Sequence, residues 1–382
     1  MLNIGDKNSV IKPIVGSWFS IYWYDRRHYY WNDACIKYTD EQWDALIRDM
    51  AELGMKYLVM CNVASHGYAV YDSKVLPKYP MASADPLEAV MTACDKYGIN
   101  VFLNNDYYHD EYYFKIDEMF YPESVKGRYT MLEEVAEKYS GHKSFYGWYW
   151  AWESYLSPYF ADHFIKYIND SSKQARLLTP KAKFLTAPYG TRTATEDAKF
   201  IKQLEELDVD IVAYQDTVGC YAMNTDESER AFEILRRVHD KVPQRKLWAD
   251  VETFTWEGKD NVAETPLIPA GFDRLKKQLA AVSPYADNIL VFIFEGLFSK
   301  PDSIAYTGYD KAGKYYNEYV AWLKEAHPED IKSIFIISIA IISITVITIL
   351  VKPIKIVTIA VITSMIEPCY EMVSLSIITI AI

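Results

Sequence analysis

The amino-acid sequence predicts an α/β fold of the (β/α)8 TIM-barrel class, with an apolar, isoleucine-rich tail at its C-terminus. Two observations predict the barrel. Short apolar runs alternate eight times with amphipathic helical patterns. Each run is too apolar for a half-exposed strand, which is typical of strands buried on both faces. A doubly wound sheet is the main alternative, but no glycine-rich phosphate-binding turn follows the first run.

The predicted strands are short and rich in β-branched and aromatic residues. They lie within residues 15–23, 56–64, 100–106, 144–153, 182–190, 209–216, 246–254 and 288–296. Strands joined by right-handed helical crossovers lie parallel, so eight such units in series close into a barrel. We therefore expect residues 1–330 to form one barrel domain.

The helical patterns between these strands have recognisable start and stop signals. Thr39 and Gln42 form a capping box before the first helix, and Gly54 ends it. Asp85 and Pro86 occupy the N-cap and first position of the second helix. Apolar stripes at helical spacing recur in residues 129–139, 160–168, 200–207, 232–238, 272–282 and 315–323.

The composition changes abruptly after Asp330. Residues 331–382 are dominated by Ile, Val, Ser and Thr, and residues 333–351 carry no charge. Such a stretch is long enough to span a bilayer, and the lysines at 352 and 355 would then place the far end in the cytoplasm. A frame-shifted, non-native extension explains the biased composition equally well. We expect residues 331–382 to be a tail of one of these two kinds.

The N-terminal segment lacks the apolar stretch of a signal peptide. The expected location is therefore the cytoplasm, unless this version of the sequence has lost a signal peptide. In that case we expect the periplasm or the cell surface. A membrane is an expected partner only through residues 333–351.

Charge and cysteine content exclude several classes of protein. A net charge of −12 disfavours nucleic-acid binding, because phosphate recognition needs clustered Lys and Arg. The cysteines show no CxxC or CxH spacing, which gives no support for a structural zinc site or a disulfide framework. We expect neither a metal nor a cofactor.

Aromatic residues make up 15% of the chain and crowd into short segments that are expected to be loops. Core packing alone does not require so many polar-tipped rings there. Flat rings with an apolar face and a polar rim suit sugars, which have C–H faces and hydroxyl edges. The predicted sugar-contacting aromatic residues are Trp18, Tyr22, Trp23 and Trp152.

Polar residues end several of the predicted strands. The active site of a barrel lies at the C-terminal ends of its strands, and alternation decides which side chains point inward. The candidates selected in this way are Asn105, Asp106, Glu153, Asp216, Glu252 and Glu295. Asp250 also points inward but lies one layer deeper, and for it we favour a purely structural role.

Several carboxylates at one barrel mouth are what glycoside hydrolysis requires. One protonated acid assists the leaving oxygen, and one carboxylate attacks the anomeric carbon or activates water. Burying a carboxylate is costly unless it is paired or used, so each of these residues could instead be a structural hydrogen-bonding group.

The pattern also resembles known proteins. Glutamates ending strands four and seven resemble the acid/base and nucleophile positions of the large retaining clan of barrel glycoside hydrolases, although that clan usually has Asn where Trp152 stands here. The segments SWFSIYWYDRR, DEQWDALIRDMAELGMKYLV, GWYWAWE and YQD more closely resemble a family of bacterial barrel proteins. That family is grouped with the glycosyl hydrolases but has no established function. The resemblance covers residues 14–325 and implies carbohydrate hydrolysis without fixing a substrate.

We therefore predict a retaining glycoside hydrolase that acts on an unidentified oligo- or polysaccharide. Glu153 would be the general acid/base and Glu252 the nucleophile, while Asp216 and Glu295 orient or tune them. The alternative that stays open is a non-catalytic carbohydrate-binding barrel.

Other chemistries have weaker support. A Schiff-base aldolase needs a strand-end lysine and a serine hydrolase needs a GxSxG elbow, and the sequence has neither. His66 and His109 follow strands two and three and could join Asp106 or Glu153 in a metal site. Without a spacing motif, we interpret both histidines as sugar-contacting or surface residues.

Overall fold

The computed structural model of the chain confirms the predicted barrel. It describes residues 11–22, 32–65, 67–105, 119–258 and 265–328, and the backbone of two short strands near the C-terminus. The chain divides into two compact units, residues 1–328 and 329–382. The first unit contains the barrel and the candidate site.

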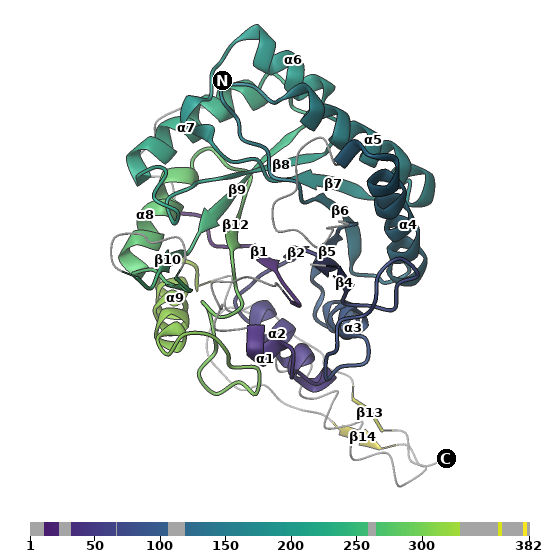
Figure 1. The fold of residues 1–382 in the computed structure, drawn as a ribbon. Coiled ribbons are helices and arrows are strands. Elements are labelled where there is room, and N and C mark those ends of the chain that lie inside the picture. Colours follow the sequence, from purple (N-terminus) through teal and green to yellow (C-terminus); the bar gives the residue numbers. More distant parts are fainter. Residues whose placement is uncertain are drawn as a thin grey trace. The chain divides into compact units, whose positions relative to one another are not determined.

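Eight parallel strands form the closed barrel, and each lies within one of the predicted runs (Figure 1). They are β1 (Gly16–Phe19), β2 (Tyr57–Met60), β5 (Asn100–Leu103), β6 (Phe145–Trp150), β7 (Lys183–Thr186), β8 (Ile211–Gln215), β9 (Lys246–Glu252) and β12 (Asn288–Phe292). The strands follow one another around the barrel in chain order, and the barrel closes where β1 pairs in parallel with β12.

Helices surround the barrel on its outside (Figure 1). They are α1 (Asn32–Cys35), α2 (Asp40–Ala51), α3 (Pro86–Tyr97), α4 (Pro122–Tyr139), α5 (Asp162–Leu178), α6 (Ala198–Glu206), α7 (Thr225–His239), α8 (Phe272–Val282) and α9 (Ala312–Ala326), with a 3-10 turn at Thr191–Thr193. The predicted caps are present. The Asp85 carboxylate accepts the Glu88 N–H at 3.0 Å, and the Thr39 N–H donates to Gln42 Oε1 at 3.0 Å.

From Gly147 onward, after a register shift against β5 that leaves Tyr146 on the inner side, strand β6 alternates as predicted. Trp148 and Trp150 point outward, because their indole N–H groups donate to Thr179 at 2.8 Å and to Ser172 at 2.9 Å, at the end of α5 and within it. Tyr149 points inward. Since Glu153 lies four positions after Tyr149, the alternation rule extends the inward face towards Glu153.

An aromatic layer fills the barrel below its mouth. Tyr57, Phe102, Tyr146 and Trp248 come from four different strands. The ring centroids of Tyr57 and Trp248 are 4.8 Å apart, and those of Phe102 and Tyr146 are 5.2 Å apart. A packed layer of this kind makes the interior a core rather than a pore, so ligands approach from the C-terminal ends of the strands.

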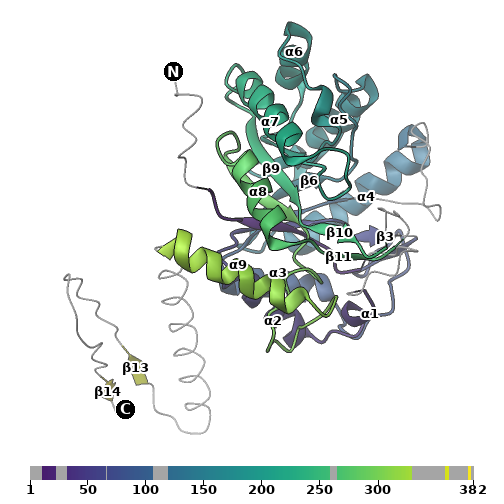
Figure 2. The ribbon, with the colours of Figure 1, turned by 90° about the vertical axis from the view of Figure 1, so that its left-hand side faces the viewer.

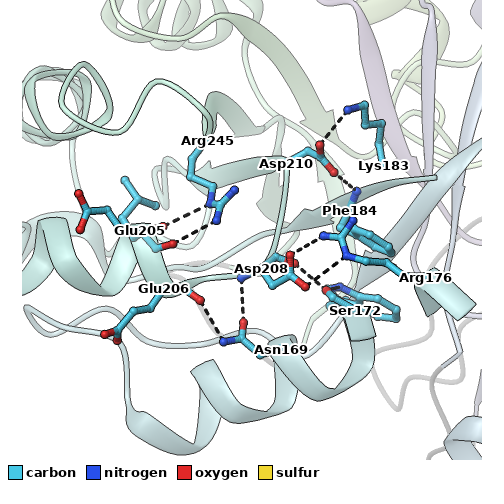
Figure 3. Close-up of polar contacts among 12 residues, drawn as sticks. Asn169, Ser172, Arg176, Lys183, Phe184, Glu205, Glu206, Asp208, Asp210 and Arg245 are labelled. Atoms are coloured by element: carbon cyan, nitrogen blue, oxygen red, sulfur yellow. Dashed lines mark hydrogen bonds and ion pairs between the residues drawn. The ribbon is translucent and has the colours of Figure 1, made fainter. Parts of the chain in front are cut away.

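The opposite end of the barrel is held by a polar network around the segment that enters β8 (Figure 3). The Asp210 carboxylate accepts a hydrogen bond from Lys183 Nζ at 2.8 Å, and the Asp208 carbonyl accepts one from the Ser172 hydroxyl at 2.6 Å. Arg245, just before β9, donates to the Glu205 carbonyl at the end of α6 at 3.1 Å. These contacts lie at the N-terminal ends of the strands. That end of a barrel typically serves stability.

Two short antiparallel ribbons follow barrel strands at the other end. β3 (Ala64–Ser65) pairs with β4 (Tyr68–Ala69), and β10 (Phe254–Trp256) pairs with β11 (Leu267–Pro269). Figure 2 shows β3, β10 and β11 at the same end of the barrel. These ribbons therefore surround the mouth.

In the second unit, β13 (Thr358–Ala360) pairs antiparallel with β14 (Ile377–Thr379). The charge-free stretch at 333–351 lies outside the described residues. Within the part of the chain that the structure describes, no helix combines the length and the apolar character needed to cross a membrane.

A chain that ends at Pro328 should fold as the full chain does. Helix α9 ties the barrel to its own N-terminal segment, because the Ile14 N–H donates to the Tyr319 hydroxyl at 2.8 Å and His327 bonds the Ile11 carbonyl at 2.7 Å. We expect one cooperative thermal transition with Tm within about 4 °C of the full chain, which corresponds to less than about 1 kcal/mol for a domain of this size. Circular dichroism measures this. Loss of cooperativity would show that residues 329–382 contribute to the core.

Candidate active site

Five acidic side chains occupy the C-terminal ends of the barrel strands, and we call them the carboxylate cluster. They are Glu153 after β6, Asp216 after β8, Asp250 and Glu252 on β9, and Glu295 after β12. Burial raises the pKa of Asp250 well above its ordinary value, and the charges of Glu252, Asp216 and Glu153 raise it further. Four members of the cluster therefore lie within electrostatic reach of one another.

Glu153 is the accessible member of the cluster. Its side chain is exposed to solvent, yet enough protein surrounds it for desolvation to raise its pKa above the ordinary value. A hydrogen bond from the Gln215 side chain opposes this shift. A carboxyl group of this kind can hold a proton and still meet a ligand, which is what a general acid must do.

Glu252 is nearly enclosed, with 6% of its surface exposed. Burial, followed by repulsion from Asp216, raises the pKa of Glu252 to about 8, and hydrogen bonds from Cys220 oppose the shift. The Cys220 backbone N–H donates to Glu252 Oε2 at 2.7 Å. Gly219 permits this approach, since a Cβ there would lie 2.6 Å from Glu252 Cβ.

The loop that supplies this N–H group is strained. Thr217 and Tyr221 have φ angles of 50° and 60°, in the left-handed region. Non-glycine residues pay about 1–2 kcal/mol each for that conformation. The Thr217 carbonyl accepts the N–H groups of Ala222 and Met223 at 3.1 and 3.2 Å, which holds the turn. Strain that surrounding bonds maintain in this way is common beside functional groups.

Asp216 is fully buried, and hydrogen bonds engage both of its oxygens. Oδ1 accepts the N–H groups of Val218 and Glu252 at 3.2 and 3.1 Å, and Oδ2 accepts Gln278 Nε2 at 2.7 Å. Burial raises its pKa to about 6, and these bonds oppose the rise. Asp216 thus fixes the backbone of Glu252. Gln278 on α8 also donates to the Glu252 carbonyl at 2.9 Å and is itself held by Arg274 Nε at 3.0 Å.

Glu295 and Asp250 each keep one unpartnered oxygen. Glu295 Oε1 accepts the Ser20 N–H at 2.6 Å, which ties the end of β12 to the end of β1. Glu295 Oε2 and Asp250 Oδ1 are buried and have no hydrogen-bond partner among the described residues. Burial raises the pKa of both groups well above the ordinary value. Both carboxyl groups therefore keep a proton to higher pH than an exposed carboxyl group does.

Three of the predicted sugar-contacting residues are packed into the protein. Trp18 is 3% exposed and meets Tyr149 edge-on at 5.9 Å between ring centroids. Tyr22 is 7% exposed and stacks on Tyr79 at 3.9 Å. Asn105 is fully buried, and its amide donates to a backbone carbonyl of α4 at 3.2 Å.

Trp152 follows β6 and faces helix α5. Its ring contacts His163 and Tyr167 of α5, each at 5.3 Å between centroids. Trp23 and Asp106 lie outside the described residues, as do the two histidines at 66 and 109. Among the residues that are described, no three His, Cys, Asp or Glu side chains are grouped so that they could hold a metal ion.

Sequence reasoning missed the groups that hold the cluster in place. Gln215 immediately precedes Asp216, and its position at a strand end was a signal that could have identified it. Cys220, Arg274 and Gln278 gave no such signal. Cys220 acts through its backbone, and the other two lie on a helix whose pattern fits ordinary core packing.

The raised pKa of Glu252 predicts how stability depends on pH. The folded state keeps a proton up to about pH 8, whereas the ordinary value is 4.5. Stability from this group is therefore complete below its ordinary pKa and is lost as the pH rises through about 8. The free energy of unfolding of Glu252→Gln, relative to that of the wild type, should increase as the pH rises from about 5 to 8. Above about pH 8 this difference should stay constant. Urea denaturation across this range measures the difference, and a constant difference would contradict the prediction.

Comparisons with known proteins agree with the barrel. The sequence profile of DUF4434, a domain of unknown function, matches residues 14–305. No curated protein matches the sequence. A protein from Bacteroides thetaiotaomicron VPI-5482 described as a "putative alpha-L-fucosidase" is similar in structure, with a TM-score of 0.64 and 19% identity over 82% of this chain and 93% of that chain. A β-galactosidase from the Antarctic haloarchaeon Halorubrum lacusprofundi gives a TM-score of 0.50 and 11% identity over 82% of this chain and 62% of that chain. At these identities the likeness shows the fold alone.

Proposed function

The chain belongs to the DUF4434 family, whose function is unknown, and we propose from its site that it is a retaining glycoside hydrolase acting on an oligo- or polysaccharide. The observation that carries the proposal is the carboxylate cluster at the barrel mouth. It combines an accessible acid, Glu153, with an enclosed carboxyl group, Glu252, that is held by a backbone N–H. The described activities of the two similar structures, on fucosides and galactosides, support a glycoside as the class of substrate.

In the first step, Glu153 donates its proton to the glycosidic oxygen while Glu252 attacks the anomeric carbon. The bond to the leaving group breaks, and a bond between the sugar and Glu252 forms. In the second step, Glu153 removes a proton from water, which attacks the same carbon and releases Glu252. The raised pKa of Glu153 favours the protonated form that the first step needs.

Glu252 must lose its proton before it can attack. Burial and repulsion from Asp216 raise the pKa of Glu252 to about 8, so near neutral pH Glu252 holds a proton, which must pass to solvent before the attack. Positive charge that develops on the sugar ring favours the arrangement with Glu252 ionised. The Cys220 N–H then stabilises the ionised oxygen. Asp216 positions Glu252 through its backbone, and Glu295 positions the end of β1 through Ser20.

Six further residues are proposed to contact or surround the substrate, as the sequence predicts. They are Trp18, Tyr22, Trp23, Asn105, Asp106 and Trp152. For the packed ones, Trp18, Tyr22 and Asn105, the proposed contribution is to the walls of the site, and Trp152 contributes by packing the end of β6 against α5. The carboxyl groups of Glu153 and Glu252 are expected to lie roughly 5–5.5 Å apart in the substrate complex, the spacing typical of retaining enzymes.

The test is hydrolysis of a panel of aryl glycosides and polysaccharides, with the configuration of the first product followed by proton NMR. We expect turnover of at least one glycoside class with retained anomeric configuration. An inverted product would contradict the two-step mechanism. Binding of sugars with no turnover of any would instead favour a carbohydrate-binding barrel.

A further inference from the structure

Two pairs of aromatic side chains flank the carboxylate cluster, and the mechanism above uses neither. Tyr155 and Tyr189 lie beside Glu153, and Tyr221 and Trp256 lie beside Glu252. We propose that these pairs are two sugar-binding subsites, so that the substrate is an oligosaccharide with a glycosyl unit on each side of the cleaved bond. The inference rests on the proposed function and names its class of substrate.

Tyr155 is held in place close to Glu153. The loops after β6 and β7 are joined by backbone hydrogen bonds from Tyr189 to the Ser154 carbonyl at 3.0 Å and from Leu156 to the Tyr189 carbonyl at 2.8 Å. The ring centroids of the two tyrosines are 5.2 Å apart. The charge of Glu153 acts on the Tyr189 hydroxyl and raises its pKa, after burial. The pair therefore borders the proposed acid.

Gly190 explains how the Tyr155 ring can be both fixed and exposed. A Cβ at Gly190 would lie 2.4 Å from Cδ2 and Cε2 of Tyr155, so the ring rests directly on the glycine backbone. The φ angle of 77° at Gly190 also suits glycine. Tyr155 nevertheless exposes 53% of its surface. A large ring that is immobilised without being covered is a preorganised binding surface, because little freedom remains to be lost on binding.

The second pair borders Glu252. Tyr221 directly follows Cys220, whose N–H donates to Glu252 Oε2 at 2.7 Å. The ring of Tyr221 stacks on Trp256 with centroids 5.9 Å apart and planes 27° apart, and its hydroxyl bonds Thr255 Oγ1 at 2.5 Å. Tyr221 is still 49% exposed.

The backbone of Tyr221 indicates that its ring is placed to meet a ligand. Tyr221 adopts a φ angle of 60°, which is unfavourable for a bulky residue, so the fold keeps its ring at the mouth at a cost.

The placement of the pairs assigns them to opposite sides of the scissile bond. Glu153 protonates the leaving oxygen, so Tyr155 and Tyr189 border the leaving-group sugar. Glu252 bonds the retained sugar, so Tyr221 and Trp256 border that unit. Rings with an apolar face and a polar rim match the C–H faces and hydroxyl edges of both sugars.

The test measures, by calorimetry, the affinity of the full chain carrying Glu252→Gln, which does not consume the ligand, for linear xylo-, manno-, galacto- and cello-oligosaccharides of two to six units. Tyr155→Ala and Tyr221→Ala should each raise the Kd about 2- to 12-fold, on the scale of one aromatic stacking contact. Tyr306→Ala is the matched control, because Tyr306 is an exposed tyrosine that instead bonds the Asp310 carbonyl in the segment before α9. It should leave the Kd unchanged.

Turnover separates the two subsites. A glycosyl fluoride has no leaving-group sugar, so Tyr155→Ala should lower kcat/KM for the oligosaccharide and leave kcat/KM for the fluoride unchanged. Tyr221→Ala should lower both. Circular dichroism checks that each variant is folded.

The possible results distinguish this inference from the proposed function. Sugar binding that both variants weaken, without turnover of any substrate, would support the subsites and refute the hydrolase. Turnover with an unchanged Kd in both variants would support the hydrolase and refute the subsites. If no oligosaccharide of the panel binds, the subsites are refuted, because stacking on exposed rings is tolerant of the type of sugar.

Discussion

Glu252→Gln should abolish hydrolysis of every glycoside that the wild-type protein cleaves. The amide has the size of the carboxyl group but cannot form the covalent intermediate. The first chemical step is therefore lost whether the leaving group is good or poor. Loss of a covalent nucleophile lowers kcat on the order of 10⁴-fold or more. Steady-state rates on an activated aryl glycoside measure this effect, because residual activity is easiest to detect with such substrates.

Loss of activity must be separated from loss of structure. The Cys220 N–H can still donate to the amide oxygen of the variant, and the variant no longer has a buried charge beside Asp216. We therefore expect Glu252→Gln to unfold at a higher urea concentration than the wild type at alkaline pH. Glu295→Gln is the matched comparison within the cluster. If Glu295→Gln is inactive and Glu252→Gln keeps full activity, the assignment of the nucleophile is wrong.

The architecture could be predicted because each strand carries its own local signal. Apolar runs separated by capped helices admit few arrangements, and the alternation of Gly147, Tyr149 and Trp148 along β6 was readable directly. The same rule identified the inward carboxylates, since strand-end position and residue parity fix where they point.

The contacts that tune the cluster could not be predicted in this way. Gln278 reaches Asp216 across 62 positions of sequence, and nothing in the pattern of α8 distinguishes it from a neighbouring polar residue. Cys220 acts through a backbone N–H, which every residue but proline has. Such contacts depend on where two distant segments meet.

The aromatic predictions illustrate a second limit. An aromatic run indicates that rings are needed but not whether their partners are protein or ligand. Trp18 and Tyr22 pack against other aromatic side chains, while Tyr155 and Tyr221, which were not selected from the sequence, remain about half exposed. For Trp152 the alternation that placed it with Trp148 and Trp150 already pointed away from the axis, and its contacts with α5 follow that rule.

Glu153→Gln should slow hydrolysis by an amount that depends on the leaving group. General acid catalysis contributes about 10²–10⁴-fold where the leaving oxygen is basic and must be protonated. For glycosides with acidic phenols as leaving groups, the first step needs little protonation and should be nearly unaffected. The second step still lacks its base, so the covalent intermediate should accumulate and produce a burst of released phenol. Stopped-flow absorbance on a series of aryl glycosides measures both effects.

Azide supplies the decisive control for this variant. It is a nucleophile that needs no base, so it should attack the intermediate, restore turnover and yield a glycosyl azide of retained configuration. The pH dependence should change as well. Desolvation raises the pKa of Glu153, which extends its protonated form to higher pH and places the alkaline limb of kcat/KM above the ordinary value of 4.5. Glu153→Gln has no group to titrate there, so that limb should disappear. An unchanged alkaline limb, together with no azide rescue, would move the acid/base role to Asp216 or Glu295.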